Sequence, residues 1–252
     1  MFLSAHQIER VAQFIIDKDG AKPTKKEVVP LLDEAHSVDI SLFGRMVAEE
    51  ASFNVDAAVQ VAHALGVSAA EPEFDYFTAV DDALEATEET GAGMIGTVQM
   101  ASSTLYRYAT VNLEQLASNL ASQEAARSAA VAFIRSFVTS MPTGKQNTFA
   151  ARTLPDAVVV SLRDDRPVSL VNAFEHPVIE EGGASRRVVS ARRMAAEFQN
   201  LGKMFDAPAV RTWVIGVDEI GEALAPLGDS TTLASLLSEL EASLDNFGDA
   251  SE

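Results

Sequence analysis

Two stretches of β-branched and aromatic residues, joined by glycines and acids, limit most strongly what this chain can fold into. The first covers residues 74–82, and the second covers residues 91–97 and 103–112. Runs of this composition on either side of a turn-rich segment are typical of antiparallel strands. We therefore expect a long β-hairpin over residues 74–113, with the acidic residues 85–89 at a mobile tip. An aromatic side chain on such an arm is suited to stacking on bases of single-stranded nucleic acid.

The charge of the chain argues against a protein that attracts nucleic acid by electrostatics alone. Its 252 residues include 37 acids against 19 lysines and arginines, for a formal net charge of −18, whereas phosphate contacts need clustered cations. There is no cysteine, which excludes disulfides and thiolate metal sites. No apolar run approaches the length of a membrane span. We expect a cytoplasmic protein without a signal peptide or a membrane partner.

Hydrophobic periodicity before the hairpin mixes helices with strands. A helix is expected over residues 4–17, where Ser4 and Gln7 form a capping box. The next helix starts either at Thr24, as a second capping box with a glutamate three residues later, or further on, with Pro30 in its first turn.

Two segments between these helices and the hairpin alternate between apolar and other residues, as half-buried strands do. Residues 38–43 are therefore expected to form a strand. Residues 55–67 fit a strand or an alanine-rich helix, and their alternation favours the strand.

The second half of the chain continues this irregular order. We expect helices over residues 113–121, 123–140, 190–205 and 232–244, strands over 157–162, 168–174 and 210–217, and disorder over 248–252. Residues 157–162 and 168–174 are expected to pair as a hairpin. Irregular alternation with several hairpins predicts an α+β fold rather than a doubly wound parallel sheet.

Catalytic and metal-binding patterns are weak. His63 has no second ligand at a suitable spacing, so we expect a hydrogen-bonded core histidine. Asp81 and Asp82 point to opposite faces if they lie on a strand, which prevents shared chelation. Residues 142–145 end in Gly-Lys but lack the upstream glycine of a Walker motif. We therefore expect no enzyme activity, no cofactor and no metal site.

Other conspicuous side chains fit structural roles. Tyr106 and Tyr108 are expected to pack within the fold, as strand aromatics commonly do. Four arginines lie near glutamates and are expected to form a solvated, salt-bridged surface. These are Arg186, Arg187, Arg192 and Arg193.

Six short segments occur in one order along the chain and together resemble a known family. They are residues 44–46 (Gly-Arg-Met), 59–64, 77–82, 104–109, 144–150 (Gly-Lys-Gln-Asn-Thr-Phe-Ala) and 171–175. The combination is similar to the CasC family, the repeated backbone subunit of Cascade, the type I-E CRISPR surveillance complex. The similarity runs from about residue 38 to about residue 174, and more loosely to the end.

The resemblance implies a subunit shaped like a right hand, with an RRM-like (ferredoxin-like) palm, helical fingers and a β-hairpin thumb. Residues 1–37 would be a remnant of the fingers, and residues 38–70 would supply palm strands. Residues 71–103 would form the thumb, 104–225 the rest of the palm, and 226–252 a C-terminal helix with a disordered tail. The first palm strand and the basic segment of the family are expected to be missing from this sequence.

The resemblance also implies a non-catalytic role on CRISPR RNA. Copies of the subunit line up along the guide, and each thumb kinks the RNA and presents its bases for pairing with target DNA. The expected partners are the guide RNA, other copies of the subunit, the other Cascade proteins and, through the guide, target DNA. RNA contacts are expected at five residues: Arg45, Met46, Phe77, Thr78 and, as a weaker candidate, Lys145.

Two other interpretations stay open at the level of sequence. The acidic balance and the missing basic segment favour a fragment that docks onto Cascade through protein contacts without holding RNA. The other interpretation is an enzyme that uses Asp81 or His63, although the spacing of the residues around them does not support it.

Overall fold

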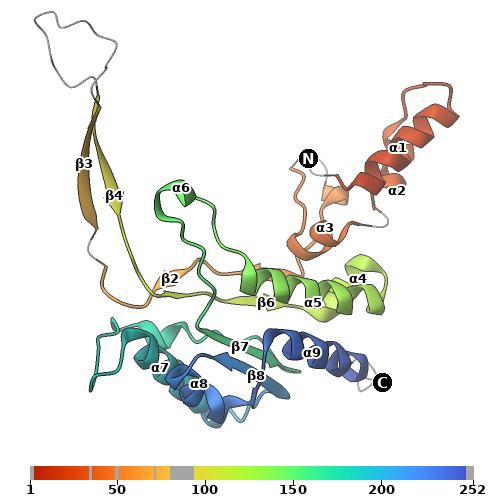
Figure 1. Ribbon diagram of the computed structural model, residues 1–252. Coiled ribbons are helices and arrows are strands. Elements are labelled where there is room, and N and C mark those ends of the chain that lie inside the picture. The colour runs from red at the N-terminus through yellow and green to blue at the C-terminus, as the bar shows by residue number, and fades with distance from the viewer. Residues whose placement is uncertain (1–2, 34–35, 49–50, 71, 80–93, 248–252) are drawn as a thin grey trace, which may run out of the picture.

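The computed structural model describes residues 3–33, 36–48, 51–70, 72–79 and 94–247. Figure 1 shows a body of helices and a small sheet from which three parts project on one side. A two-stranded ribbon rises at one end, a lobe of short helices lies at the other end, and a loop bearing a short helix stands between them. The mixture of helices and antiparallel pairs confirms the α+β class.

The helical lobe contains α1 (Ala5–Asp17), α2 (Lys25–Asp33), α3 (Val38–Phe43) and the 3₁₀ turn η1 (Ala51–Phe53). The predicted capping box is present, because Ser4 Oγ accepts from the Gln7 N–H and Gln7 Oε1 accepts from the Ser4 N–H, both at 3.1 Å. Helix α2 follows Thr24 directly and contains Pro30 in its interior. The first of the two proposed starts is therefore the right one.

The strand predicted over residues 38–43 is wrong, since these residues form helix α3. Ile40, Ser41 and Leu42 are buried in succession, which a strand with one solvated face does not do. Gly44 ends the helix with φ +74°, and its N–H donates to the Ile40 carbonyl at 2.8 Å. Six residues are too few for the apolar pattern to separate the two periods.

The ribbon confirms the predicted hairpin and begins earlier in the chain than expected, at Val59. Its outgoing side carries β1 (Val59–Val61), β2 (Leu65–Gly66) and β3 (Glu73–Ala79), and its returning side carries β4 (Met94–Met100), β5 (Leu105–Tyr106) and β6 (Ala109–Val111). All three pairs are antiparallel: Val59 lies opposite Val111, Leu65 opposite Tyr106 and Glu73 opposite Met100. The strand expected over residues 55–67 is thus present in two pieces. The tip, residues 85–89, lies outside the described residues.

The body is a sheet of β7 (Ala157–Leu162), β8 (Arg211–Gly216) and β9 (Asp229–Ser230), with β8 in the centre. Strand β7 is antiparallel to β8, and β9 is parallel to β8. The hairpin predicted between residues 157–162 and 168–174 is therefore wrong. The latter segment includes the 3₁₀ turn η2 (Val171–Phe174), and the Leu170 N–H donates to the Tyr106 hydroxyl rather than to a strand.

Helices cover both faces of this sheet. Trp213 and Leu162 pack into a core with α4 (Leu113–Leu120), α5 (Gln123–Thr139) and α9 (Leu233–Phe247). Val214 packs into a second core with α7 (Arg186–Met204), α8 (Glu219–Leu224) and the 3₁₀ turn η3 (Ala225–Leu227). The expected helices over 113–121, 123–140, 190–205 and 232–244 are confirmed, although α7 begins four residues earlier than expected, at Arg186. Residues 248–252, where disorder was expected, lie outside the described residues.

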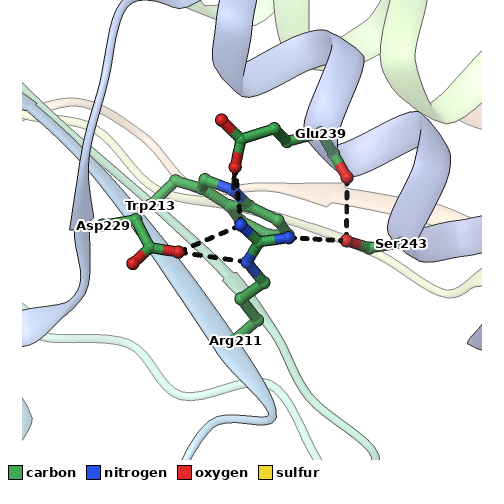
Figure 2. A network of polar contacts seen from close by, with 5 residues as sticks. All are labelled: Arg211, Trp213, Asp229, Glu239 and Ser243. Atoms are coloured by element: carbon green, nitrogen blue, oxygen red, sulfur yellow. Dashed lines mark hydrogen bonds and ion pairs between the residues drawn. The ribbon is translucent and has the colours of Figure 1, made fainter.

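Polar contacts fix α9 to the sheet (Figure 2). The Arg211 guanidinium donates to Asp229 Oδ2 at 3.1 Å, to Glu239 Oε2 at 2.6 Å and to Ser243 Oγ at 3.2 Å. The fully buried Trp213 donates its indole N–H to the same Glu239 oxygen at 3.1 Å. Glu239 and Ser243 lie one turn apart on α9. Their contacts with Arg211 therefore fix which face of the helix meets the sheet and where the helix lies along its axis.

Candidate nucleic-acid interface

The β3–β4 hairpin presents two different faces, because side chains alternate along each strand. Phe74, Tyr76 and Thr78 share one face with Ile95 and Thr97 of the opposite strand. All five side chains are exposed, and Tyr76 has 75% of its surface accessible. A projecting arm that exposes aromatic and aliphatic side chains together is a surface suited to stacking or to a partner.

Phe77 lies on the opposite face of the hairpin, directly across from Gly96. A Cβ atom on Gly96 would stand 2.5 Å from Phe77 Cζ, so the phenyl ring lies over the strand where the glycine leaves room. The ring is still 39% exposed. The hairpin therefore offers one ring edge held by packing, with Thr78 next in the chain but on the opposite face, beside Tyr76.

Met46 stands at a turn of the helical lobe and is 83% exposed. Two contacts close this turn: Arg45 and Val55 exchange backbone hydrogen bonds at 2.9 Å, and the Val47 N–H donates to Asn54 Oδ1 at 2.6 Å. Gly44 precedes the turn, and a Cβ there would lie 2.7 Å from the Val55 carbonyl oxygen. A methionine thioether held this far into solvent is a soft, sequence-tolerant contact group.

Arg45, the neighbour of Met46, lies inside the lobe and is only 6% exposed. Its guanidinium donates to the Phe53 carbonyl at 2.8 Å, to Gln7 Oε1 at 3.2 Å and to the Leu32 carbonyl at 3.4 Å. The side chain thus ties the Met46 turn to α1 and α2 instead of reaching into solvent. Gln7, which sequence reasoning noted only as a helix cap, is the buried partner that completes this link.

Lys145 stands in the loop between α5 and β7, immediately before the one-turn helix α6 (Gln146–Phe149). Its backbone is left-handed, with φ 53° and ψ 24°, and its side chain is exposed. Figure 1 places α6 between the ribbon and the helical lobe. The five predicted contact residues therefore occupy three separate projections of one molecule and do not form one pocket.

Several predicted roles can be compared directly with the structure. Tyr106 is structural, since its hydroxyl accepts from the Leu170 N–H at 2.9 Å and its ring centroid lies 5.1 Å from that of Phe174. Tyr108 is half-buried, and burial raises the pKa of its phenol. The core position expected for His63 is wrong, because that side chain is exposed between β1 and β2.

Three of the four arginines of α7 form the expected salt bridges, and the fourth, Arg186, donates to Ser68 Oγ at 3.3 Å instead. Arg187 pairs with Asp156 at 2.9 Å, and Arg192 and Arg193 lie within 3.9 Å of glutamates. Asp81 and Asp82 lie outside the described residues. Across the part of the chain that is described, no three His, Asp or Glu side chains gather as a metal site would require. Nor does any helix in that part combine the length and apolarity of a membrane span.

The sequence and the fold both match known proteins. The model of the family described as CT1975-like protein matches residues 1–239. A chain of a solved "CRISPR RNA-guided surveillance complex, pre-nicking" is 34% identical, with a TM-score of 0.77, over 92% of this chain and 63% of that chain. A chain of a second "CRISPR RNA-guided surveillance complex" is 32% identical, with a TM-score of 0.71, over 96% of this chain and 85% of that one. The chain thus spans less than two thirds of the length of the first of these two chains. None of the curated proteins matches.

Proposed function

Because the chain belongs to the family of CT1975-like proteins, we propose that it is a non-catalytic, RNA-binding backbone subunit of a CRISPR surveillance complex. The observation that carries this proposal is the similarity to a chain of such a complex at 34% identity over 92% of the present sequence. This chain shares its fold with chains of RNA-guided surveillance complexes, and its own projecting surfaces are suited to an RNA ligand.

The hairpin is the thumb in this proposal, and it acts as a wedge. The Phe77 ring, seated on Gly96 and partly exposed, inserts between two neighbouring bases, and Thr78 contacts the sugar or phosphate of the displaced nucleotide. Every base has a π-face, so an aromatic wedge separates bases without reading their sequence. Guide pairing with target DNA then carries the specificity, as in another RNA-guided effector.

Met46 is the second contact, and Arg45 serves it indirectly. The thioether of Met46 packs beside the displaced base. Arg45 holds the turn through its three hydrogen-bond acceptors, so it has a positioning role instead of the direct phosphate contact that the resemblance implies. Lys145 contacts the RNA backbone from the loop between the two.

Hairpin and helical lobe lie at opposite ends of the molecule (Figure 1), which fits a repeating assembly. The thumb of one copy kinks the guide held by the lobe and palm of the next copy, so each site is completed between protomers. In this proposal the body and the base of the ribbon form the RRM-like palm of a type I-E Cascade subunit in the cytoplasm. The palm comprises residues 38–70 and 104–225, flanked by fingers (1–37), thumb (71–103) and the C-terminal segment (226–252).

The test uses a complex assembled by co-expressing the chain with a guide RNA and its partner proteins. Substituting Phe77→Ala together with Met46→Ala removes both base contacts and should lower guide affinity at least about fivefold, the lower limit for one lost stacking contact. Met204→Ala with Phe205→Ala is the matched control, since these are an exposed methionine and phenylalanine at the end of α7. Unchanged guide retention in the first variant would remove the wedge.

A second function is favoured by one observation, the formal net charge of −18. In this alternative the chain docks onto the complex by protein contacts and holds no RNA. It predicts that the chain joins the assembled complex while both double variants retain the guide equally.

A further inference from the structure

The loop of residues 141–155, called here the α6 loop, is basic although the chain as a whole is acidic. From Ala125 to Pro155 the sequence contains no Asp or Glu, and its charged residues are Arg127, Arg135, Lys145 and Arg152. Arg127 pairs with Asp245 at 2.9 Å. Within the described residues the other three have no ion-pair partner, whereas Arg187, Arg192 and Arg193 of α7 each lie near a carboxylate. Uncompensated cations on an acidic protein mark a surface that attracts anions.

Apolar side chains are exposed among these cations. Phe149 has 46% of its surface accessible, and Leu154 and Met141 are exposed as well. Lys145 and Arg152 are also exposed, one on each side of Phe149 in the sequence. Proteins that bind single-stranded nucleic acid combine basic groups along the backbone with aromatic rings for the bases.

The backbone of the α6 loop is held in a specific conformation. Lys145 and Ala150 adopt positive φ angles of 53° and 48° at the two ends of α6, which is uncommon for residues other than glycine. The Gln146 amide clips the loop, because Nε2 donates to the Pro142 carbonyl at 3.1 Å and to the Ala151 carbonyl at 3.2 Å. Backbone of this kind persists where surrounding contacts hold it and is common at ligand-binding loops.

The start of the loop is anchored by a further arginine. The Arg107 guanidinium lies 4.4 Å from the centroid of the Phe137 ring and donates to the Ser140 carbonyl at 3.0 Å. The loop therefore rises from a fixed point at the end of α5. It projects on the same side of the body as the ribbon and the helical lobe (Figure 1).

From these observations we propose that the α6 loop is an additional contact for single-stranded RNA, beyond the hairpin and the Met46 turn. The Phe149 ring stacks on a base, Lys145 and Arg152 bind phosphates on either side of it, and Gln146 positions all three by closing the loop. This inference rests on the proposed function, because it assigns new residues, Phe149 and Arg152, to the same guide.

The test measures binding of the full chain to fluorescein-labelled single-stranded oligouridine at low ionic strength by fluorescence anisotropy. Phe149→Ala should weaken binding at least about fivefold, the lower limit for one stacked base. Lys145→Glu with Arg152→Glu should reduce the slope of log K against log salt by about 1.4, since each lost single-strand phosphate contact contributes roughly 0.7.

Controls match each change in chemistry and exposure. Phe205→Ala removes an exposed phenylalanine directly after α7, and Lys22→Glu with Lys203→Glu gives the same net charge at exposed sites elsewhere in the chain. Both controls should bind as the wild type does. Thermal unfolding of every variant verifies that the loop changes leave the fold intact.

The outcomes separate this inference from the function on which it rests. If the loop variants bind like the wild type, or no worse than their controls, while Phe77→Ala with Met46→Ala lowers guide affinity in the assembled complex, the loop contact is overturned and the wedge remains. Loop variants that keep RNA affinity but drop out of the assembled complex would identify a protein surface and also overturn it. Absence of RNA binding by the wild type, alone and in the complex, would overturn both proposals.

Discussion

At the scale of single residues, the absence of a side chain at Gly96 determines where the Phe77 ring lies. Phe77 covers Gly96 because no Cβ occupies that position. Gly96→Val should push the ring aside while changing the free energy of unfolding little, since the contacting atoms belong to the far end of a rotatable side chain. We expect guide affinity to fall as far as in Phe77→Ala, measured by RNA retention in the assembled complex alongside urea unfolding.

Thr97→Val is the matched control for this change, because it places the same valine one residue away on the other face of β4. It should retain the guide. A Gly96→Val protein with normal affinity would mean that the ring position is irrelevant to RNA.

Residue-level roles were only partly predictable from the sequence. The composition of residues 74–82 indicated an exposed aromatic arm, but which residue faces Gly96 depends on a register that the intervening loop sets. Arg45 shows a second limit: its acceptors belong to Gln7, Leu32 and Phe53. A buried contact between segments so distant in sequence leaves no local pattern, so nothing in the sequence opposed the direct RNA contact that the resemblance implies for Arg45.

At the scale of elements, α9 is fixed by a leucine stripe. Leu236, Leu237, Leu240 and Leu244 are all buried, with Leu236 in the core around Trp213. Leu236→Ala should lower the free energy of unfolding by about 2–5 kcal/mol through lost burial and a cavity. Leu154→Ala, at an exposed leucine of the α6 loop, should stay within about 0.5 kcal/mol. Equal midpoints in urea denaturation would contradict the assigned core.

Long elements were predictable because their periodicity repeats over several turns. Helices α4, α5 and α9 lie where the apolar spacing placed them. The strands predicted over residues 38–43 and 168–174 were wrong because both segments are short. Each spans less than two helical turns, so its apolar pattern does not repeat often enough to separate a strand from a helix or turn. The pairing of β7 with β8 also joins segments separated by η2, the whole of α7 and their flanking loops, and no turn signal marks such a distant partner.

At the scale of the whole molecule, net charge opposes the proposed ligand. With 37 acids against 19 lysines and arginines, the isolated chain should bind single-stranded RNA weakly at physiological salt and measurably only at low ionic strength. Filter binding across a salt series checks this expectation. Tight binding that falls steeply with salt would mean that the chain alone presents a much larger cationic surface than the α6 loop.

The fold class and the family could be predicted at this scale, because both depend on many segments at once. A wrong assignment of one helix or strand changes neither the irregular alternation nor the order of the six motifs. The arrangement of three projections on one side of the body could not. It depends on how α4 and α5 pack across the base of the ribbon, which is a tertiary contact without a sequence period.

The ribbon has unequal sides: between the Gly66–Leu105 pair and the Glu73–Met100 pair, the chain has six residues on the way out and four on the way back. Extra residues in one strand bend a two-stranded arm toward the shorter strand. This bend therefore sets the direction of the arm, and the length of the paired segment beyond it sets how far the arm extends. Each further residue pair would carry the end outward by about 3.3 Å. In the repeating assembly proposed above, the length of strands β3 and β4 would then set the distance between neighbouring copies.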